Sequence, residues 1–408
     1  MKTIALLALV LAQNLALASP TKVTIDENNI FYINGKPWFP MCFTPAGPPL
    51  RAKDQSGRDA LDVLKAGGID CFRVGTGSWV EGHEGECKAY MDWLAEHGMY
   101  AFLNLRELSI LTPDQPGIKD HLGKVVEEFK DHPALAVWKS MDEPAWGKAP
   151  IDGLMAGYSY LKEADPDHPV WMAHAPRNTV YLLHRYCMAC DATGLDIYPI
   201  SIPKGLHSNG HMSNREISVV GDYTEFITRA VDGKKPIIMV LQVCWSGTMP
   251  PHQLVFPTFR QERYMAYQAI IKGARGLFFF GMNLCLDGRD EKLGFNWTYW
   301  NKVMCPLLKE IGKGSELHQA LLVPDSKIPL TASGAPDIEF TAREVGDFLY
   351  ILAAKREGPK ANVQFSGDVL KGDIEVMFEG RKLQARDGTF TDPFAPNDVH
   401  VYKVRLGS

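Results

Sequence analysis

The sequence predicts an α/β fold: a (β/α)8 TIM barrel followed by a small C-terminal antiparallel β-sandwich. Between residue 36 and about residue 313, eight apolar runs of strand length alternate with longer amphipathic segments. Near-continuous apolar strands, each followed by a helix, indicate a parallel sheet that is covered on its outer face. Eight such units over about 280 residues match the size of a closed barrel of this type. After about residue 318 the runs become short and alternating, which is typical of antiparallel sheets.

The predicted barrel strands and helices follow one another in regular order. The strands are expected at 38–43, 69–75, 99–104, 134–141, 169–174, 192–198, 236–243 and 276–282. The helices between them are expected at 58–66, 84–97, 118–130, 151–163, 214–231, 260–272 and 298–311. Glycine or proline stands at several of the joints, at Gly67-Gly68, Gly98, Pro133 and Pro169, where such residues end a helix before the next strand.

The N-terminus has the features of a secretory signal peptide over residues 1–18. Lys2 is followed by an apolar stretch and by Ala16-Leu17-Ala18, a small-x-small cleavage site. We therefore expect a secreted or periplasmic protein. No later segment is long and apolar enough to cross a bilayer, so no membrane contact is expected after cleavage.

The remaining chain divides into three predicted parts. Residues 19–35 are expected to form a strand hairpin that closes the barrel floor, with Asn34-Gly35 as its turn. Residues 36–317 form the barrel. Residues 318–408 form the β-sandwich, with strands at 338–341, 348–354, 362–365, 374–378 and 399–404 separated by turns rich in glycine and aspartate. We interpret the sandwich as a stabilising appendage.

Charge and cysteine content narrow the possible partners. The formal net charge is −5, which gives no reason to expect nucleic acid. Of the eight cysteines, Cys42, Cys71, Cys244 and Cys285 lie in apolar runs and are expected to act as small buried hydrophobic residues. Cys187-Met-Ala-Cys190 has the spacing of metal ligands, but a closed zinc site needs a second pair. One disulfide is compatible with this pattern, and a structural zinc is not expected.

The most informative stretch runs from Ala136 to Pro144, where an apolar strand ends at Asp142-Glu143-Pro144. Proline disfavours the helical region for the residue before it, so Glu143 is expected in an extended or turn conformation. This holds a carboxylate at the C-terminal tip of the strand. In parallel α/β proteins these tips carry the chemistry.

Polar residues end the other predicted strands as well, and tryptophans follow them closely. Carboxylates, amides and flat aromatic faces suit a sugar-binding site, because one acid must protonate the leaving oxygen and aromatic rings pack on the sugar. The expected partner is therefore a carbohydrate. The candidate substrate-binding residues are Arg73, Glu107, His174, Tyr198, Gln242, Trp245, Asn283 and Trp146.

Three segments resemble the opening half of clan A glycoside hydrolases. They are the run from Phe31 to Pro40, Arg73 within Phe72-Arg73-Val74, and the run from Trp138 to Pro144. The resemblance implies a (β/α)8 barrel whose fourth strand ends in Asn-Glu-Pro, with the glutamate as acid/base. It therefore implies that Glu143 is the proton donor, and that Arg73 helps to hold the carboxylate opposite.

Two residues depart from this pattern. Asp142 stands where the clan has asparagine, and the seventh strand ends in Gln242 where the clan has its nucleophilic glutamate. A glutamine has no negative charge for the developing oxocarbenium ion. In one alternative, Asp196 acts as the base of an inverting reaction, with Glu107 as the next candidate. In the other, Asp142-Glu143 resembles the adjacent Asp-Glu pair of hexosaminidases. In those enzymes the substrate's own acetamido group attacks the anomeric carbon.

The chain is thus predicted to be a glycoside hydrolase with Glu143, Asp142 and Asp196 as catalytic residues. The alternative is a noncatalytic glycan-binding protein on the same barrel, which Gln242 favours. A metal-dependent hydrolase or polysaccharide lyase would need clustered ligands, and His174, His184, His207 and His211 are scattered along the chain. No metal is expected, and no cofactor motif is present. The sugar, the linkage and the oligomeric state are left open.

Overall fold

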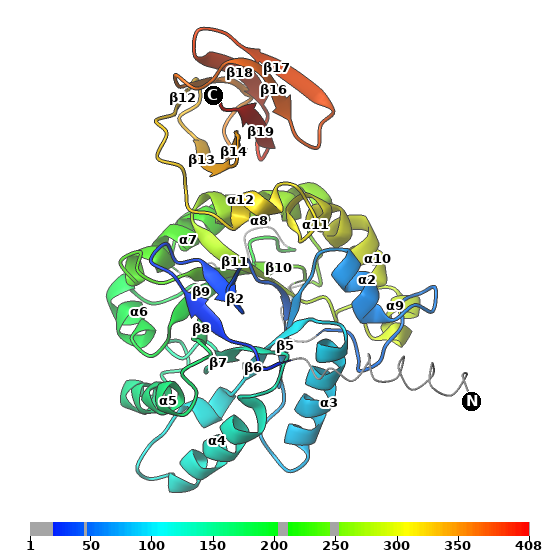
Figure 1. The fold of residues 1–408 in the computed structure, drawn as a ribbon, viewed down its shortest axis with the longest axis vertical. Coiled ribbons are helices and arrows are strands. Elements are labelled where there is room, and N and C mark those ends of the chain that lie inside the picture. Colours follow the sequence, from blue (N-terminus) through cyan, green and yellow to red (C-terminus); the bar gives the residue numbers. More distant parts are fainter. Residues whose placement is uncertain (1–18, 45–46, 203–210, 245–252, 408) are drawn as a thin grey trace, which may run out of the picture.

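The computed structural model describes residues 19–44, 47–202, 211–244 and 253–407, and its centre is a closed parallel barrel (Figure 1). The hydrogen-bonded order around the barrel is β10-β11-β4-β5-β6-β7-β8-β9. The predicted fold class, a TIM barrel followed by an antiparallel β-sandwich, is confirmed. The barrel strands are β4 (Met41–Thr44), β5 (Cys71–Val74), β6 (Tyr100–Asn104), β7 (Leu135–Lys139), β8 (Val170–His174), β9 (Ala192–Ile197), β10 (Ile237–Gln242) and β11 (Ala274–Phe280).

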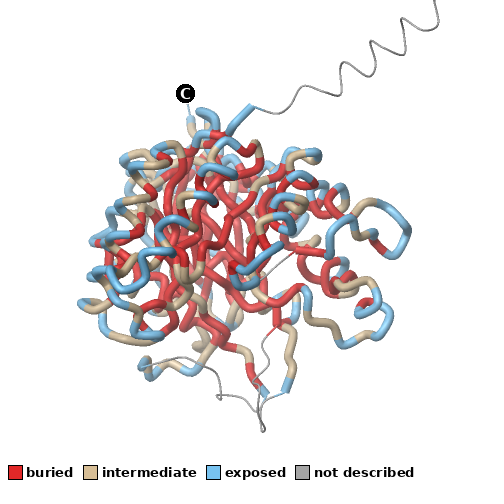
Figure 2. The backbone as a smooth tube through the Cα atoms, turned by 90° about the horizontal axis from the view of Figure 1, so that it is seen from below, coloured by how far each residue is buried: buried red, intermediate tan, exposed pale blue. Residues whose placement is uncertain are grey.

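Helices form the outer layer of the barrel and leave the strands buried on both faces. Every residue of β7 and β10 is buried, as expected for parallel strands between a packed interior and a helical layer. Figure 2 shows the buried segments concentrated in the middle of the molecule. The helices that follow the first seven strands are α2 (Ala60–Ala66), α3 (His83–Glu96), α4 (Pro116–Phe129), α5 (Ile151–Ala164), α6 (Val180–Cys187), α7 (Val219–Ala230) and α8 (Phe259–Ile271).

The first predicted strand is in fact two strands. The structure places β3 (Lys36–Trp38) in a separate sheet and begins the first barrel strand at Met41. Pro40 lies between them, and its missing N–H does not support a continuous ladder. The sheet β1 (Val23–Ile25), β2 (Phe31–Ile33) and β3 is antiparallel, and Figure 1 shows β2 drawn across the opening of the barrel.

This small sheet closes one end of the barrel with apolar side chains. Phe31, Ile33 and Trp38 share one buried cluster with Phe102 and Trp171 of the barrel interior. The indole N–H of Trp38 donates a 2.6 Å hydrogen bond to Asp70, which precedes β5. A ligand therefore reaches the barrel interior from the opposite end, where the strands have their C-terminal ends.

The last predicted barrel helix is divided in the structure. It consists of α10 (Trp297–Tyr299), a π-helical turn η2 (Trp300–Met304) and α11 (Cys305–Ile311). Pro306 stands in the first turn of α11, where it lacks an N–H and crowds the carbonyl of the preceding turn. The short helices α9 (Gly288–Leu293), α12 (His318–Leu321) and the 3-10 turn η1 (Arg106–Ser109) complete the helical part.

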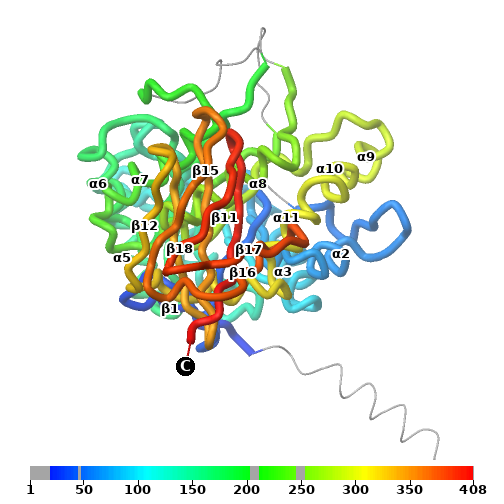
Figure 3. Tube along the Cα trace, turned by 90° about the horizontal axis from the view of Figure 1, so that it is seen from above, coloured from blue at the N-terminus to red at the C-terminus, as the bar shows by residue number. Residues whose placement is uncertain are grey.

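The C-terminal sandwich packs one of its sheets on the barrel (Figures 1 and 3). Its three-stranded sheet has the order β12-β15-β18 and its five-stranded sheet the order β13-β14-β19-β16-β17. Tyr350, Leu352 and Val401 of the five-stranded sheet belong to the same apolar cluster as the barrel helices. The strands are β12 (Thr331–Ser333), β13 (Ile338–Val345), β14 (Phe348–Lys355), β15 (Ala361–Ser366), β16 (Gly372–Val376), β17 (Arg381–Ala385), β18 (Thr389–Phe394) and β19 (Val399–Arg405).

Ion pairs reinforce this contact. Arg356, which follows β14, donates two hydrogen bonds to Asp222 on α7, at 2.8 and 3.0 Å. Glu357 accepts hydrogen bonds from the backbone and hydroxyl of Ser218.

Among the described residues, no helix has both the length and the hydropathy that a membrane span requires.

Candidate active site

A cavity of about 280 Å³ opens among the C-terminal ends of the barrel strands. Every barrel strand except β6 contributes to its wall, directly or through the residues that follow it. Carboxylates and cations form one part of this wall and aromatic rings another. The lining residues are Thr44, Arg73, Lys139, Asp142, Glu143, Trp171, Ala173, Asp196, Tyr198, Val240 and Phe280.

Glu143 occupies a strained backbone position just after β7. Its φ is 46°, in the left-handed region, so the extended alternative expected before Pro144 is wrong and the residue lies in a bend. Its N–H donates to the carbonyl of Ala173 on β8 at 3.0 Å, and its carbonyl accepts from Gly147 at 2.9 Å. Such conformations cost about 1–3 kcal/mol and persist where the surroundings enforce them, often at functional sites.

Asp142 lies between two cations. The ammonium of Lys139 donates to one carboxylate oxygen at 2.8 Å, and the guanidinium of Arg73 donates to the other at 3.3 Å. Burial alone would raise the pKa of Asp142, but the charges of Lys139 and Arg73 outweigh it and hold this pKa well below its usual range. Asp142 is therefore a permanent carboxylate that faces the cavity.

Lys139 ends β7 with its side chain almost completely buried, at 1% exposure. Its ammonium lies 5.5 Å from the centre of the Trp171 ring. Burial lowers the pKa of Lys139 to about 8, although the charge of Asp142 opposes this effect. The amine is thus a cation at neutral pH only because its counter-ion lies beside it.

Glu143 and Asp196 form a second pair, two neighbouring carboxyl groups on the cavity wall. Burial is the largest cause that raises the pKa of both residues, and the charge of Asp142 raises each further. Their contact lowers the pKa of Glu143 and raises that of Asp196, so ionisation of one carboxyl disfavours ionisation of the other. The other oxygen of Asp196, Oδ1, is buried without a hydrogen-bond partner.

This contact bears on the expected role of Asp196 as the base of an inverting reaction. An inverting pair leaves room for water, with about 6.5–9.5 Å between its carboxyl groups. The structure places Asp196 beside Glu143 on the same cavity wall. The role of Asp196 as the base stays a prediction.

Gln242 ends β10 as expected, but its amide does not face a ligand. Its Nε2 donates to the carbonyl of Ile200 at 2.7 Å, and its Oε1 accepts from the N–H of Ile200 at 2.8 Å. The side chain is fully buried and is absent from the cavity wall. Its observed contacts fix the chain after β9, whereas the sequence suggested a contact with a sugar.

The structure brings some of the predicted binding residues to the cavity and not others. Arg73 and Tyr198 line it, and the Tyr198 ring stacks on Phe280 with centroids 5.0 Å apart. Four other predicted residues do not line the cavity. Glu107 accepts a hydrogen bond from the backbone of Trp79, and His174 is buried against Cys187. Asn283 is exposed, and so is Trp146, which stacks with Arg177. Trp245 lies outside the described residues.

Sequence reasoning missed Lys139, Trp171 and Phe280 as cavity residues. The signal for Lys139 was available, since a lysine inside a strand buried on both faces needs a counter-charge, and Asp142 follows three positions later. Trp171 and Phe280 carried no such signal, because aromatic residues in buried strands are usually core residues.

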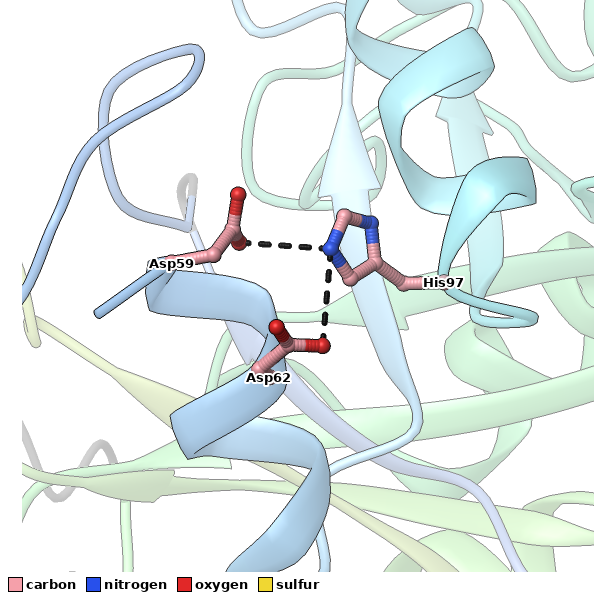
Figure 4. A group of neighbouring side chains, drawn as sticks. All are labelled: Asp59, Asp62 and His97. Carbon is pink, nitrogen blue, oxygen red and sulfur yellow. Dashed lines mark ion pairs between the residues drawn. The ribbon is translucent and has the colours of Figure 1, made fainter.

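A group of metal-type ligands exists elsewhere, at the contact of α2 with α3 (Figure 4). The Nε2 atom of His97 lies 3.4 Å from Asp59 and 3.6 Å from Asp62. Asp59 also caps α2 by accepting the N–H of Leu61. The geometry is explained by ion pairing and helix capping, and none of the three residues lines the cavity.

Comparison with known proteins shows the fold. No family model matches the sequence, and no curated protein matches it either. A solved structure described as a glycoside hydrolase superimposes with a TM-score of 0.63 at 15% identity, over 95% of this chain and 97% of that one. A glycoside hydrolase family 5 protein from Bacteroides vulgatus gives 0.62 at 14% identity, over 95% and 93%. A family 42 β-galactosidase from G. stearothermophilus gives 0.54 at 10% identity, over 85% and 95%.

Proposed function

We propose that the protein is a glycoside hydrolase and that Glu143 is its general acid. The observation that carries this proposal is that Glu143, Asp196 and Asp142 line one cavity at the C-terminal ends of the barrel strands, where burial and the charge of Asp142 raise the pKa of Glu143. A glycosidase needs a carboxylic acid that keeps its proton near neutral pH and a second group that stabilises the anomeric centre. The structural neighbours with this barrel are described as glycoside hydrolases, which supports the same reading.

In this proposal Asp196 is a positioning residue for the acid. Its raised pKa favours a neutral Asp196 beside Glu143, while burial and the charge of Asp142 raise the pKa of Glu143 and favour the proton that the acid must donate. When the glycosidic bond breaks, Glu143 donates this proton to the leaving oxygen. The remaining carboxylate then takes a proton from the water molecule that completes the reaction.

The second catalytic role falls to Asp142 together with the substrate. A carboxylate held by Lys139 and Arg73 accepts the N–H of a 2-acetamido group and orients its carbonyl oxygen toward the anomeric carbon. That oxygen forms the new bond as the bond to the leaving group breaks. Water later attacks the same carbon and releases the acetamido group. This route needs no carboxylate on β10, where Gln242 is bound to the backbone.

The cavity wall suits one sugar unit. Its volume, about 280 Å³, lies just below the range of about 300–1,000 Å³ for small-molecule sites. Trp171, Tyr198 and Phe280 supply aromatic surface against which the apolar face of a sugar ring packs. We also propose that residues 1–18 direct export, which fits an enzyme that acts on carbohydrates outside the cell.

The test is hydrolysis of a panel of aryl glycosides, including N-acetylhexosaminides, by the wild type and by Glu143→Gln and Asp142→Asn. We expect the wild type to hydrolyse N-acetylated sugars with retention of the anomeric configuration, which proton NMR of the products measures. We expect both variants to lose this hydrolysis. Glu127→Gln removes an exposed carboxylate from α4 and is the matched control. Equal turnover by Glu143→Gln and the wild type would contradict the assignment of the acid. Inversion would contradict the role of Asp142 and the substrate.

A noncatalytic glycan-binding protein is the second candidate, because the clan's nucleophile position is a glutamine with a structural role. This candidate predicts binding on a glycan array without turnover. It also predicts that Glu143→Gln binds the same glycans as the wild type.

A further inference from the structure

The pair Cys187 and Cys190, which the proposed sugar chemistry does not use, lies at the end of α6 behind the barrel wall. Cys187 is the last residue of α6, and Cys190 follows in the turn that leads to β9. Cys190 Sγ donates a hydrogen bond to the backbone carbonyl of Cys187 at 3.3 Å, so its thiol is turned back toward Cys187. Both cysteines are buried and neither forms a disulfide in the structure. This is a dithiol with Cys-x-x-Cys spacing at a helix end.

The surroundings of this dithiol activate one of its sulfurs. The Nε2 atom of His174 lies 3.5 Å from Cys187 Sγ, and Thr193 Oγ1 lies 3.6 Å from it. The hydrogen bond from Cys190, together with His174, lowers the pKa of Cys187 although burial opposes this effect. The same contact with Cys187, with burial, raises the pKa of Cys190. One thiolate beside one thiol is the arrangement that supports thiol–disulfide exchange.

A second pair in the same protein provides the contrast. Cys42 and Cys71 are register partners on the neighbouring strands β4 and β5, and Cys42 Sγ donates to the carbonyl of Phe43 at 3.4 Å. Both are fully buried in the apolar barrel interior, and burial raises the pKa of each. No histidine contact is present at either sulfur among the described residues. Each pair thus places two cysteines near each other. At Cys187 the surroundings lower the pKa of the thiol, whereas at Cys42 and Cys71 burial raises it.

A metal is not the better explanation for Cys187 and Cys190. Among the residues that the structure describes, Asp59, Asp62 and His97 are the group whose ligand atoms lie close enough together to hold a metal ion. Cys187, Cys190 and His174 do not form such a group. His174 contacts only the first of the two sulfurs.

We propose that Cys187 and Cys190 are a redox site that forms an intramolecular disulfide by exchange with a small-molecule or protein disulfide. The Cys187 thiolate attacks one sulfur of the oxidant and releases the first thiol. Cys190 then loses its proton, attacks Cys187 Sγ and releases the second thiol. The protein gives up two electrons and two protons, and the oxidant disulfide becomes two thiols. The proposed export would place this site in an oxidising compartment.

Access to the site depends on the turn after α6. Met188, between the two cysteines, is 53% exposed, so the dithiol lies directly beneath the surface. The ammonium of Lys235 donates to the carbonyls of Cys187 and Cys190, at 2.8 and 2.6 Å, and holds this turn closed. Local opening at a helix end requires little free energy compared with global unfolding, and it exposes both sulfurs.

The experiment uses the full-length reduced protein and oxidised glutathione as the probe. After acid quenching, free thiols are blocked with N-ethylmaleimide in denaturant and the peptides are mapped by mass spectrometry. We expect the peptide that carries Cys187 and Cys190 to lose two hydrogen atoms and to gain no label. Cys42 and Cys71 should each carry one label. Labelling of both Cys187 and Cys190 would overturn the proposal, as would oxidation of Cys42 and Cys71 at the same rate.

Three variants sharpen the assignment. Cys190→Ser should trap glutathione on Cys187, because the resolving thiol is missing, whereas Cys187→Ser should leave Cys190 without glutathione. Lys235→Met should accelerate oxidation of the wild-type pair several-fold, because it releases the turn. Glutathione on Cys190 in Cys187→Ser would overturn the assigned order of attack. The wild-type map tests the proposal even if a variant does not fold.

Discussion

The ammonium of Lys139 donates a 2.8 Å hydrogen bond to the carboxylate of Asp142, three residues further along the chain. Lys139 is unusual for its position, because it ends a barrel strand that is buried on both faces. Its charge and that of Asp142 compensate each other. The pair therefore explains how a buried lysine is tolerated at the wall of the cavity.

This compensation predicts the stability of single and double variants. Asp142→Asn leaves Lys139 buried without its counter-ion, and we expect a loss of about 3 kcal/mol in the free energy of unfolding. Lys139→Met/Asp142→Asn removes both charges and should recover most of that loss. Guanidinium unfolding measures the difference. The exposed pair Lys88–Asp92 is the matched control, where the same substitutions should have little effect. Equal instability of Asp142→Asn and the double variant would show that the charges do not compensate.

The Glu143–Asp196 contact predicts a pH dependence of stability. Folding raises the pKa of Asp196 above its unfolded pKa of about 3.9. At any pH between these two pKa values, the native state binds more protons than the unfolded state. The contribution of this group is fully present below the unfolded pKa and is lost as pH rises through the folded pKa. We expect Asp196→Asn to flatten this decrease in stability, measured by urea unfolding from pH 4 to pH 8. Parallel curves for variant and wild type would contradict the raised pKa of Asp196.

The backbone contacts of Gln242 predict that a glutamate is not tolerated at this position. In Gln242→Glu the donor to the Ile200 carbonyl is lost and a carboxylate is buried against it. We expect a loss of about 1–3 kcal/mol in stability, and no gain of glycosidase activity. Thermal unfolding and hydrolysis assays measure the two effects. Gln319→Glu, at an exposed position of α12, is the control. A stable and more active Gln242→Glu variant would show that this position faces the substrate.

The exposed Trp146 predicts a binding effect without a stability effect. Its ring lies 4.3 Å from the Arg177 guanidinium, outside the cavity wall but in the loop that follows Glu143. We expect Trp146→Ala to raise KM several-fold for longer saccharides while aryl glycosides are hydrolysed normally. Its free energy of unfolding should change by less than about 0.5 kcal/mol. Phe378→Ala, at an exposed aromatic residue of the sandwich, should change neither. An unchanged KM for every saccharide would remove Trp146 from the binding site.

The alternation of apolar runs and amphipathic segments was sufficient to predict the barrel and the sandwich, because each pattern depends on burial along one element. It was less reliable at Pro40 and Pro306, where one proline divided a predicted strand and another changed the path of a helix. The placement of Glu143 directly after the fourth barrel strand was also predicted. Its left-handed backbone was not, because that conformation is enforced by the carbonyl of Ala173 on the neighbouring strand.

By itself, the sequence determined the fold class and the strand ends at which polar residues gather, since both follow from local periodicity and from the position of each residue along its strand. Only the tertiary structure decided which of these side chains meet. It paired Glu143 with Asp196, bound Gln242 to the backbone at Ile200 and placed Lys139 beside Asp142. Two of these three contacts join residues at the ends of different barrel strands. Their distances depend on how the strands close into the barrel, which no local pattern records.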